Sequence, residues 1–232
     1  MVDRAERNRR IARLKTLWVD TLYTKAVHNA LEDLRDLGLG ETEADALLIL
    51  GPSRCGKTWA LSEYARRYPA ERTPTGWRRP VVMVEAPSNC SPRGMAARIL
   101  VVLGDVAPDR GDRSTLTTRV IHLLKKQRVE LLIIDEIQHL IDKEKDRIAY
   151  NAADWLKEII NANVCPVVLA GLDSAEPVIL TNLQLVGRTN ETVRLKAFDF
   201  ADPSDRLQFQ YVLTEIESEL ALPEPSNLAA YD

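Results

Sequence analysis

An eight-residue glycine-rich motif constrains the fold of this chain more than any other feature of the sequence. Residues Gly51 to Thr58 read Gly-Pro-Ser-Arg-Cys-Gly-Lys-Thr and match the pattern G-x-x-x-x-G-K-[ST]. The motif follows a short apolar run, Ala46 to Leu50, and precedes a segment that we expect to be helical from about Lys57 to Tyr68. Glycines let the backbone curl, so that its N–H groups face a phosphate at the positive end of that helix. The sequence therefore predicts a strand, a phosphate-binding loop and a helix, in this order.

The residue types of the motif indicate the ligand. Lys57 can reach the β- and γ-phosphates of a nucleotide, and Thr58 can place its hydroxyl on Mg²⁺. We therefore predict that the chain binds ATP with Mg²⁺. The expected nucleotide contacts of the loop and the first helical turn are Gly51, Pro52, Ser53, Arg54, Cys55, Gly56, Lys57, Thr58 and Trp59.

A second candidate element is the segment from Leu131 to Glu136, in which four apolar residues are followed by two carboxylates. A continuous apolar run suits a strand that is buried on both faces. Such a strand would deliver Asp135 beside the phosphate-binding loop, where it would hold Mg²⁺ together with Thr58. Glu136 would act as the general base on the attacking water. The pair of acids favours ATP hydrolysis over simple nucleotide storage.

The rest of the chain alternates predicted helices with predicted strands, a pattern that is typical of a parallel sheet. The expected strands are 46–50, 81–85, 130–134, 167–170 and 191–195. The other expected helices are about 3–19, 22–37, 92–103, 116–128, 147–162 and 205–220, and 69–80 is expected to be a loop. We predict an α/β fold, a three-layer α/β/α core with a five-stranded parallel sheet. The expected parts are an N-terminal helical segment (1–40), the core (41–204) and a C-terminal helix and tail (205–232).

Composition excludes several other classes of protein. With 232 residues the chain can form one α/β domain with flanking helices. A formal charge of −3 argues against a protein that coats nucleic acid by bulk charge. No apolar run approaches the length of a membrane span, and no secretion signal is visible. The three cysteines lack metal-site spacing, so we expect reduced thiols in a cytoplasmic protein.

Two weaker candidates leave alternatives open. Asp173 or Ser174, after the fourth strand, could sense the γ-phosphate, or could cap a helix N-terminus, which both residue types do well. Arg188, before the fifth strand, could reach the ATP of a neighbouring subunit as an arginine finger, or could be a solvated surface residue.

Together these stretches resemble the AAA+ ATPases of the TniB/TnsC type, the transposon-encoded regulators of DNA transposition. The resemblance covers residues of about 20–200. Its more specific part is the strand that runs into Ile137-Gln138-His139-Leu140, joined to Gly171 and to the later Gln184-Leu185-x-x-Arg188 pattern. The other matching stretches are the phosphate-binding loop, 21–37, 84–88, 152–161 and 167–171.

The resemblance implies an ATP-dependent homo-oligomer, a ring or helical filament on duplex DNA. Such an assembly links a transposase to a target-selection protein, either TniQ-like or a CRISPR effector. ATP then sits between subunits, which favours the finger role of Arg188, and Tyr23 and Thr24 pack by the adenine. From the sequence alone, Tyr23 is a helix-face aromatic. AAA+ proteins normally carry a helical lid after the core, but only about 26 residues follow Arg206 and none is basic, so we expect an absent or incomplete lid and weak turnover.

DNA contacts are expected from two loops on the side away from the nucleotide, 88–93 and 109–118. Neither loop has residues arranged to read bases, so we expect sequence-independent phosphate contact; the alternative is ordinary solvated loop charge. The candidate side chains are Arg93, Arg110, Arg113, Thr115 and Thr117.

Two other functions remain possible on sequence grounds. A replication-type helicase loader or initiator ATPase would use the same core. A nucleotide-gated signalling scaffold would use ATP binding rather than turnover.

Overall fold

The computed structural model describes residues 3–38, 46–141, 146–183, 189–222, 224 and 226–230. By the contacts between their residues, the chain divides into two compact units. The smaller unit comprises residues 1–25 and 197–232, and the larger comprises 26–196. The domain boundaries predicted from the sequence, at 40 and 204, stay a prediction.

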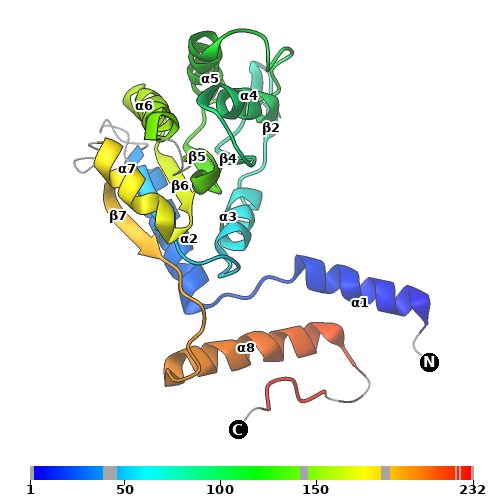
Figure 1. The fold of residues 1–232 in the computed structure, drawn as a ribbon. Helices are drawn as coiled ribbons and strands as arrows, with labels where there is room; N and C mark the ends of the chain where they lie inside the picture. Colours follow the sequence, from blue (N-terminus) through cyan, green and yellow to red (C-terminus); the bar gives the residue numbers. More distant parts are fainter. Residues whose placement is uncertain are drawn as a thin grey trace. The chain divides into compact units, whose positions relative to one another are not determined.

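A five-stranded parallel sheet forms the centre of the larger unit (Figure 1). The strand order is β4-β5-β6-β1-β7. These strands are β1 (Ala46–Leu50), β4 (Val81–Glu85), β5 (Leu131–Asp135), β6 (Val167–Gly171) and β7 (Thr189–Arg194). Every residue of β1, β5 and β6 is buried, because helices cover both faces of the sheet. The structure confirms the predicted five-stranded parallel α/β fold.

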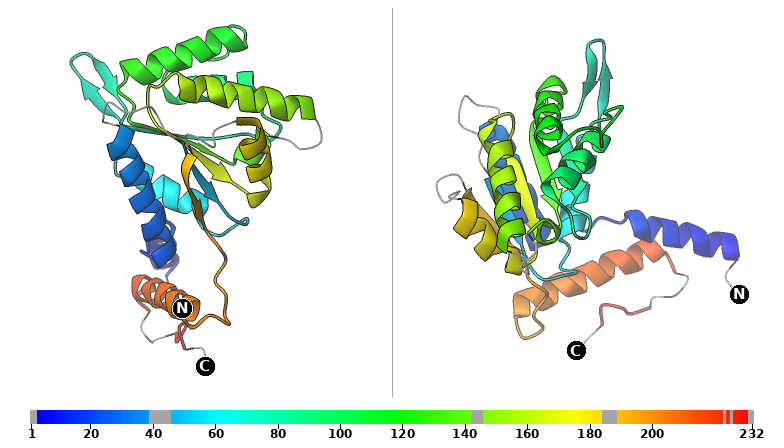
Figure 2. Two further views of the ribbon diagram at one scale, coloured as in Figure 1. Left: turned by 90° about the vertical axis from the view of Figure 1, so that its left-hand side faces the viewer. Right: turned by 45° about the horizontal axis from the view of Figure 1, so that its top comes forward.

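Helices cover the sheet in two layers, which Figure 2 shows on opposite faces. The helices are α2 (Leu22–Gly38), α3 (Lys57–Arg66), α4 (Pro92–Val102), α5 (Arg113–Lys126), α6 (Asp146–Asn161) and α7 (Glu176–Leu183). Buried residues of α4, α5 and α6 pack in one core cluster with alternate residues of the strands. The other strand residues face α2 and α3. This is the predicted three-layer α/β/α arrangement.

Several elements of the described chain were not expected from the sequence, among them α7. The segment 69–80, predicted to be a loop, contains an antiparallel hairpin of β2 (Glu71–Thr73) and β3 (Gly76–Arg78). The hairpin turns at Pro74 and Thr75, and Gly76 follows with a φ of +128°. The Thr73 hydroxyl donates to the Gly76 carbonyl at 2.8 Å. Two short 3₁₀ helices, η1 (Ile137–His139) and η2 (Asp173–Ala175), were also not expected. Strands of three residues carry too little periodicity for a prediction from sequence.

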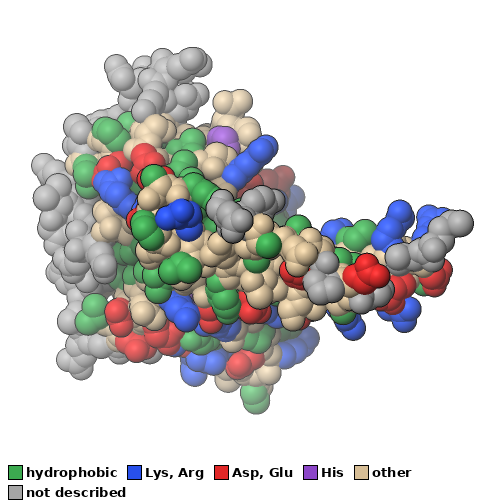
Figure 3. All heavy atoms as spheres, turned by 90° about the horizontal axis from the view of Figure 1, so that it is seen from below, with side chains coloured by type: hydrophobic (Ala, Val, Ile, Leu, Met, Phe, Trp, Pro, Cys, Tyr) green, Lys and Arg blue, Asp and Glu red, His purple; other side chains and the backbone are tan. Residues whose placement is uncertain are grey.

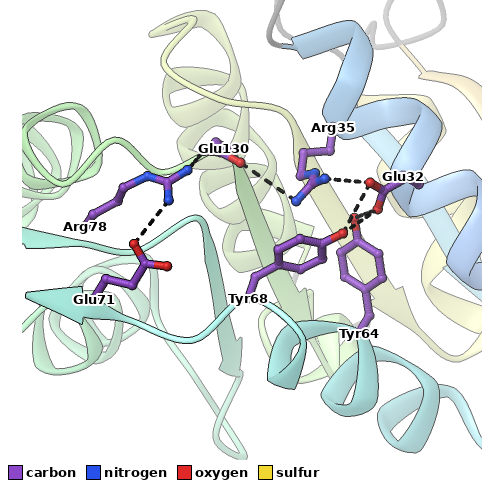
Figure 4. Close-up of polar contacts among 7 residues, drawn as sticks. All are labelled: Glu32, Arg35, Tyr64, Tyr68, Glu71, Arg78 and Glu130. Carbon is purple, nitrogen blue, oxygen red and sulfur yellow. Dashed lines mark hydrogen bonds and ion pairs between the residues drawn. The ribbon is translucent and has the colours of Figure 1, made fainter.

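A polar network lies where the strands of the sheet begin (Figure 4). The Tyr64 and Tyr68 hydroxyls donate to the Glu32 carboxylate at 2.7 and 2.9 Å. Burial opposes ionisation of Glu32, but these hydrogen bonds and the charge of Arg35 outweigh it and lower the Glu32 pKa. The Arg35 guanidinium also lies 3.9 Å from the centre of the Tyr68 ring. The network thus fastens the end of α2 to the end of α3.

The same network continues to the hairpin through Glu130. This carboxylate lies 3.8 Å from the Arg35 guanidinium and accepts from Arg78 at 2.7 Å. Arg78 also pairs with Glu71 across the hairpin at 3.4 Å. The residue before β5 therefore ties the hairpin to α2 (Figure 4).

In the smaller unit, α1 (Arg4–Thr16) and α8 (Pro203–Leu220) contact each other. Asp205 is buried at the start of α8, where its carboxylate accepts from the Tyr23 hydroxyl and from the Asp199 backbone N–H. The rings of Tyr23 and Phe198 lie 5.9 Å apart. A buried carboxylate with two donors holds this segment together.

A buried indole anchors α6 to α5 in the larger unit. Trp155 is fully buried, and its Nε1 donates to the Thr117 hydroxyl oxygen at 3.1 Å. The Thr117 hydroxyl in turn donates to the Arg113 carbonyl at 2.7 Å. Each polar atom of this contact is therefore satisfied inside the core.

The Thr117→Val variant should lose about 1–3 kcal/mol of stability, because it leaves the buried Trp155 N–H without an acceptor. In a domain of this size, each kcal/mol lowers Tm by about 2–4 °C in thermal unfolding. Thr118→Val is the matched control. Its hydroxyl donates to the Ser114 carbonyl in the same way but is exposed, so its Tm should stay close to wild type. Equal losses in the two variants would contradict the role of the indole contact.

Candidate functional site

The glycine-rich loop closes the carboxyl end of β1 and begins α3. Gly51 has a φ of +157°, and a Cβ added there would lie 2.3 Å from the Leu195 carbonyl oxygen, so only glycine fits. Gly56 has a φ of +95° and Arg54 a φ of +64°, both in the left-handed region. Left-handed residues within a turn direct neighbouring backbone N–H groups toward the same side, which creates a concave site for an anion.

Lys57 folds back onto the loop that precedes it. Its ammonium donates to the carbonyls of Gly51 at 2.9 Å and Pro52 at 2.8 Å, and the residue is only 5% exposed. The positive charge is therefore held at the mouth of the loop. Of the other expected nucleotide contacts, Pro52, Ser53, Arg54, Thr58 and Trp59 are exposed.

Thr58 and Asp135 join the loop to β5. The Thr58 hydroxyl donates to Asp135 Oδ2 at 2.6 Å, and Asp135 Oδ1 accepts the backbone N–H of Glu136 at 2.8 Å. Asp135 is fully buried, and this burial raises its pKa, although the hydrogen bonds and the Lys57 charge oppose the rise. The two residues predicted to share Mg²⁺ thus lie in direct contact. A hydroxyl and a carboxylate are oxygen donors of the kind that Mg²⁺ prefers.

Glu136 occupies a left-handed conformation, with φ 56° and ψ 40°, directly after the strand. Its carboxylate accepts from Gln138 Nε2 and lies 3.9 Å from His139 Nε2. Gln138 Oε1 also accepts the Leu172 backbone N–H at 3.2 Å. Gln138 belongs to a stretch that carries the family resemblance, but its position in the sequence indicates no role, since only the fold brings it to the end of β6.

Asp173 follows β6 in η2, where its carboxylate pairs with Arg194 at 3.2 Å. Arg194 also pairs with Glu176 and lies at the end of β7, in register with Leu50. Asp173 thus lies at the sheet edge that carries the loop, and its role as a γ-phosphate sensor stays a prediction. Ser174 lies in the same 3₁₀ helix. Arg188 lies outside the described residues.

The two residues predicted near the adenine belong to the smaller unit. Tyr23 donates to Asp205 through its hydroxyl. The Thr24 hydroxyl donates to the Thr21 carbonyl at 3.1 Å, and its oxygen accepts the Thr21 N–H at 2.9 Å. These contacts fix the start of α2, and contact with adenine stays a prediction for both residues.

The two predicted DNA-contact loops meet at the beginnings of α4 and α5. Arg93 Nε donates to the Gly111 carbonyl at 3.0 Å, and Nη2 donates to the Asp109 carbonyl at 2.6 Å. Arg113 lies 3.7 Å from the Glu158 carboxylate. The exposed members of the predicted set are Arg93, Arg110, Arg113 and Thr115.

Two expectations about these loops are wrong. Thr117 cannot contact DNA, because it is fully buried beneath Trp155. The loop 88–93 does not lie away from the nucleotide site. The Cys90 N–H donates to the His139 carbonyl at 3.1 Å, which places this loop beside the turn that carries Glu136. It follows β4, and the carboxyl ends of parallel strands meet at the same edge.

Other kinds of site are not seen in the part of the chain that the structure describes. The three cysteines are free, and no group of three His, Cys, Asp or Glu side chains there could hold a metal ion. Among those same residues, no helix is both long and apolar enough to span a membrane.

The raised pKa of Asp135 gives a prediction about stability. A carboxyl whose pKa is raised from 3.8 on folding favours its protonated form in the folded protein. The fold therefore loses stability as the pH rises through the pKa of Asp135 in the folded protein and the carboxyl ionises. Asp135→Asn removes this cost and can still bond Thr58 and the Glu136 N–H. At pH 7 the variant should gain about 0.5–2 kcal/mol, and this gain should disappear in acid.

Thermal unfolding at pH 7 and at acidic pH measures this effect. Asp112→Asn is the control, because hydrogen bonds from Thr115 lower the pKa of Asp112 and asparagine caps a helix equally well. It should show no gain. A lower Tm for Asp135→Asn than for wild type at pH 7 would sink the explanation.

Comparisons with known proteins bear on the family and the fold of the chain. The family model described as bacterial TniB protein matches residues 10–199. The curated proteins contain no match to this chain. Many solved structures share the fold.

Three of these structures come from Aeropyrum pernix and Pyrobaculum aerophilum. Aeropyrum pernix ORC1, solved in complex with DNA, is 19% identical, with a TM-score of 0.59 over 91% of this chain and 53% of that one. Cdc6p from Pyrobaculum aerophilum is 16% identical, with a TM-score of 0.61 over 88% and 52%. Aeropyrum pernix ORC2, solved in ADPNP–ADP complexes, is 13% identical, with a TM-score of 0.58 over 84% and 50%.

This chain thus spans about half the length of those proteins, and the likeness shows the AAA+ type of fold. The family model spans most of the chain and includes the loop, β5 and β6. The chain therefore belongs to the bacterial TniB protein family.

Proposed function

We propose that this chain is a Mg²⁺-dependent ATPase that assembles on duplex DNA and links target-site selection to a transposase. One observation carries the ATPase part. Lys57 and Thr58 of the loop lie at the same edge of the sheet as Asp135, the last residue of β5, and Glu136, which follows it. A 2.6 Å hydrogen bond joins Thr58 to Asp135. Together these residues supply a cation, a hydroxyl, a buried acid and a second acid, which are the groups that phosphoryl transfer to water requires.

The proposed chemistry follows from these residues. Loop N–H groups would cradle the phosphates, and Lys57 would turn from the Gly51 and Pro52 carbonyls toward the β- and γ-phosphates. Mg²⁺, when bound, would neutralise charge on these phosphates. Thr58 and ionised Asp135 would hold it. Glu136 would accept a proton from the water that attacks the γ-phosphorus, and ADP would leave.

Family membership supports the part of the proposal that concerns DNA. The proposed partners are duplex DNA, further copies of this chain, a transposase and a target-selection protein, in the cytoplasm. Arg188 of one copy would complete the site of the next. On the face seen from below, positive and negative side chains of the described residues are interspersed (Figure 3). Such a surface suits local phosphate contacts rather than coating by bulk charge.

A helicase loader or initiator is the second candidate. It is favoured by the fold likeness to ORC1, which was solved with DNA. Gene context separates the two: a neighbouring transposase gene supports the transposition role, and a replication operon supports the loader. The same ATPase site serves both functions.

Two variants should separate nucleotide binding from hydrolysis. Lys57→Ala should lose ATP binding, because it removes the cation that reaches the phosphates. Glu136→Gln should bind ATP but lower kcat by about 10²–10⁴-fold, as expected for loss of a general base. Nucleotide titration and phosphate release measure the two effects. Normal turnover in Glu136→Gln would remove Glu136 from the mechanism.

Charge removal should identify the DNA surface. Arg110→Ala and Arg113→Ala should weaken duplex binding equally for unrelated sequences, and each should reduce the slope of log affinity against log salt by about one. Arg66→Ala is the control, because this exposed arginine pairs with Glu63 on α3. Fluorescence anisotropy across a salt series measures the slopes. Unchanged slopes, or electron micrographs without assemblies on DNA and ATP, would count against the proposal.

A further inference from the structure

Gln138 bridges the proposed base and the end of β6. Its Nε2 donates to the Glu136 carboxylate, and its Oε1 accepts the Leu172 backbone N–H at 3.2 Å. A glutamine amide supplies one donor group and one acceptor atom, and here each faces its complement. The side chain is half-buried, so water competes little for either bond.

The contact at β6 leaves Gln138 little freedom. A Cβ added to Gly171 would lie 2.5 Å from Gln138 Oε1 and 2.8 Å from Ile137 Cγ2. Strand β6 and η1 therefore approach each other closely only because residue 171 has no side chain. A shift of the β6 end must shift the amide with it.

The same strand end also holds the phosphate-binding loop. The Gly51 N–H donates to the Gly171 carbonyl at 3.3 Å. Beyond Leu172, Asp173 is fastened to Arg194 of β7. The backbone at 171–173 thus touches the loop, the amide that holds Glu136, and the neighbouring strand.

Few other groups can orient the Glu136 carboxylate. Among the described residues, Gln138 is the side chain that hydrogen-bonds it. His139 Nε2 lies 3.9 Å away, and the Lys57 ammonium is directed to carbonyls of its own loop. Asp135 turns one carboxylate oxygen to Thr58 and the other to the Glu136 N–H. The direction of the Glu136 carboxylate thus depends chiefly on Gln138.

We propose that Gln138 is a positioning residue, which holds the Glu136 carboxylate in one orientation and ties that orientation to the backbone at Leu172. Movement of the segment after β6, which leads toward Arg188, would then realign the base and change turnover without changing ATP affinity. This inference rests on the proposed function, in which Glu136 is the general base.

Gln138→Glu and Gln138→Ala test the proposal. Glutamate keeps the length of the side chain and can still accept from Leu172, but when ionised it cannot donate to Glu136. Both variants should lower kcat about 10- to 100-fold, as misplacement of a catalytic group does, and leave the affinity for ATP close to wild type. Steady-state phosphate release, nucleotide titration and Tm are measured for each.

Gln127→Ala is the matched control. This buried glutamine donates to the Leu103 carbonyl at 2.7 Å, remote from the loop, so its loss should lower Tm and leave kcat unchanged. A normal kcat in both Gln138 variants would overturn the proposal. So would a loss of ATP affinity and Tm that matches the loss of kcat, because that pattern indicates a merely structural role.

The double variant Glu136→Gln/Gln138→Ala completes the test. If Gln138 acts through Glu136, its removal should change kcat little once Glu136 is already replaced. Full additivity of the two losses would overturn the positioning role while leaving the ATPase proposal intact. Wild-type protein without turnover would overturn the ATPase proposal and this inference together. Glu136→Gln with normal turnover would remove Glu136 as the base and overturn this inference, while the ATPase proposal would stand.

Discussion

The hydrogen bond between the Thr58 hydroxyl and the Asp135 carboxylate is the contact on which the rest of the site depends. It joins the first turn of α3 to the end of β5, although 77 residues separate the two in sequence. Asp135 is fully buried, and burial raises its pKa, so ionisation at neutral pH costs folding free energy. A fold that retains such a cost at a sheet edge has a carboxylate suited to a cation. The proposed Mg²⁺ site therefore carries a cost in folding free energy when no cation is bound.

A single glycine connects the parts of the site. Gly171 accepts from the first residue of the loop, and its missing side chain lets Gln138 approach the end of β6. Glu136 is thereby linked to the segment that precedes β7. If ATP lies between subunits, as the family resemblance implies, this link would let a neighbouring copy influence the base. In that arrangement the ATP site would be formed by two neighbouring copies rather than by one chain alone.

Sequence patterns predicted the elements that are continuous along the chain. The apolar residues at 46–50, 131–134 and 167–170 require burial on both faces, and the loop motif predicted a turn between the first of these strands and the helix that begins at Lys57. The patterns failed where distant segments meet. Nothing local marks Thr117 as an acceptor for Trp155, Gln138 as a partner of Leu172, or the loop 88–93 as a neighbour of η1. Short strands such as β2 and β3 also lack a periodicity to detect.

The central claim is that Thr58 and Asp135 form a cation site that completes nucleotide binding. The most direct measurement is the ATP affinity of the wild-type protein at neutral pH, titrated with Mg²⁺ and again with a chelator that removes it. The structure predicts markedly tighter binding with Mg²⁺, since the buried Asp135 carboxylate then gains a partner for its charge. Equal affinity with and without Mg²⁺ would contradict the claim.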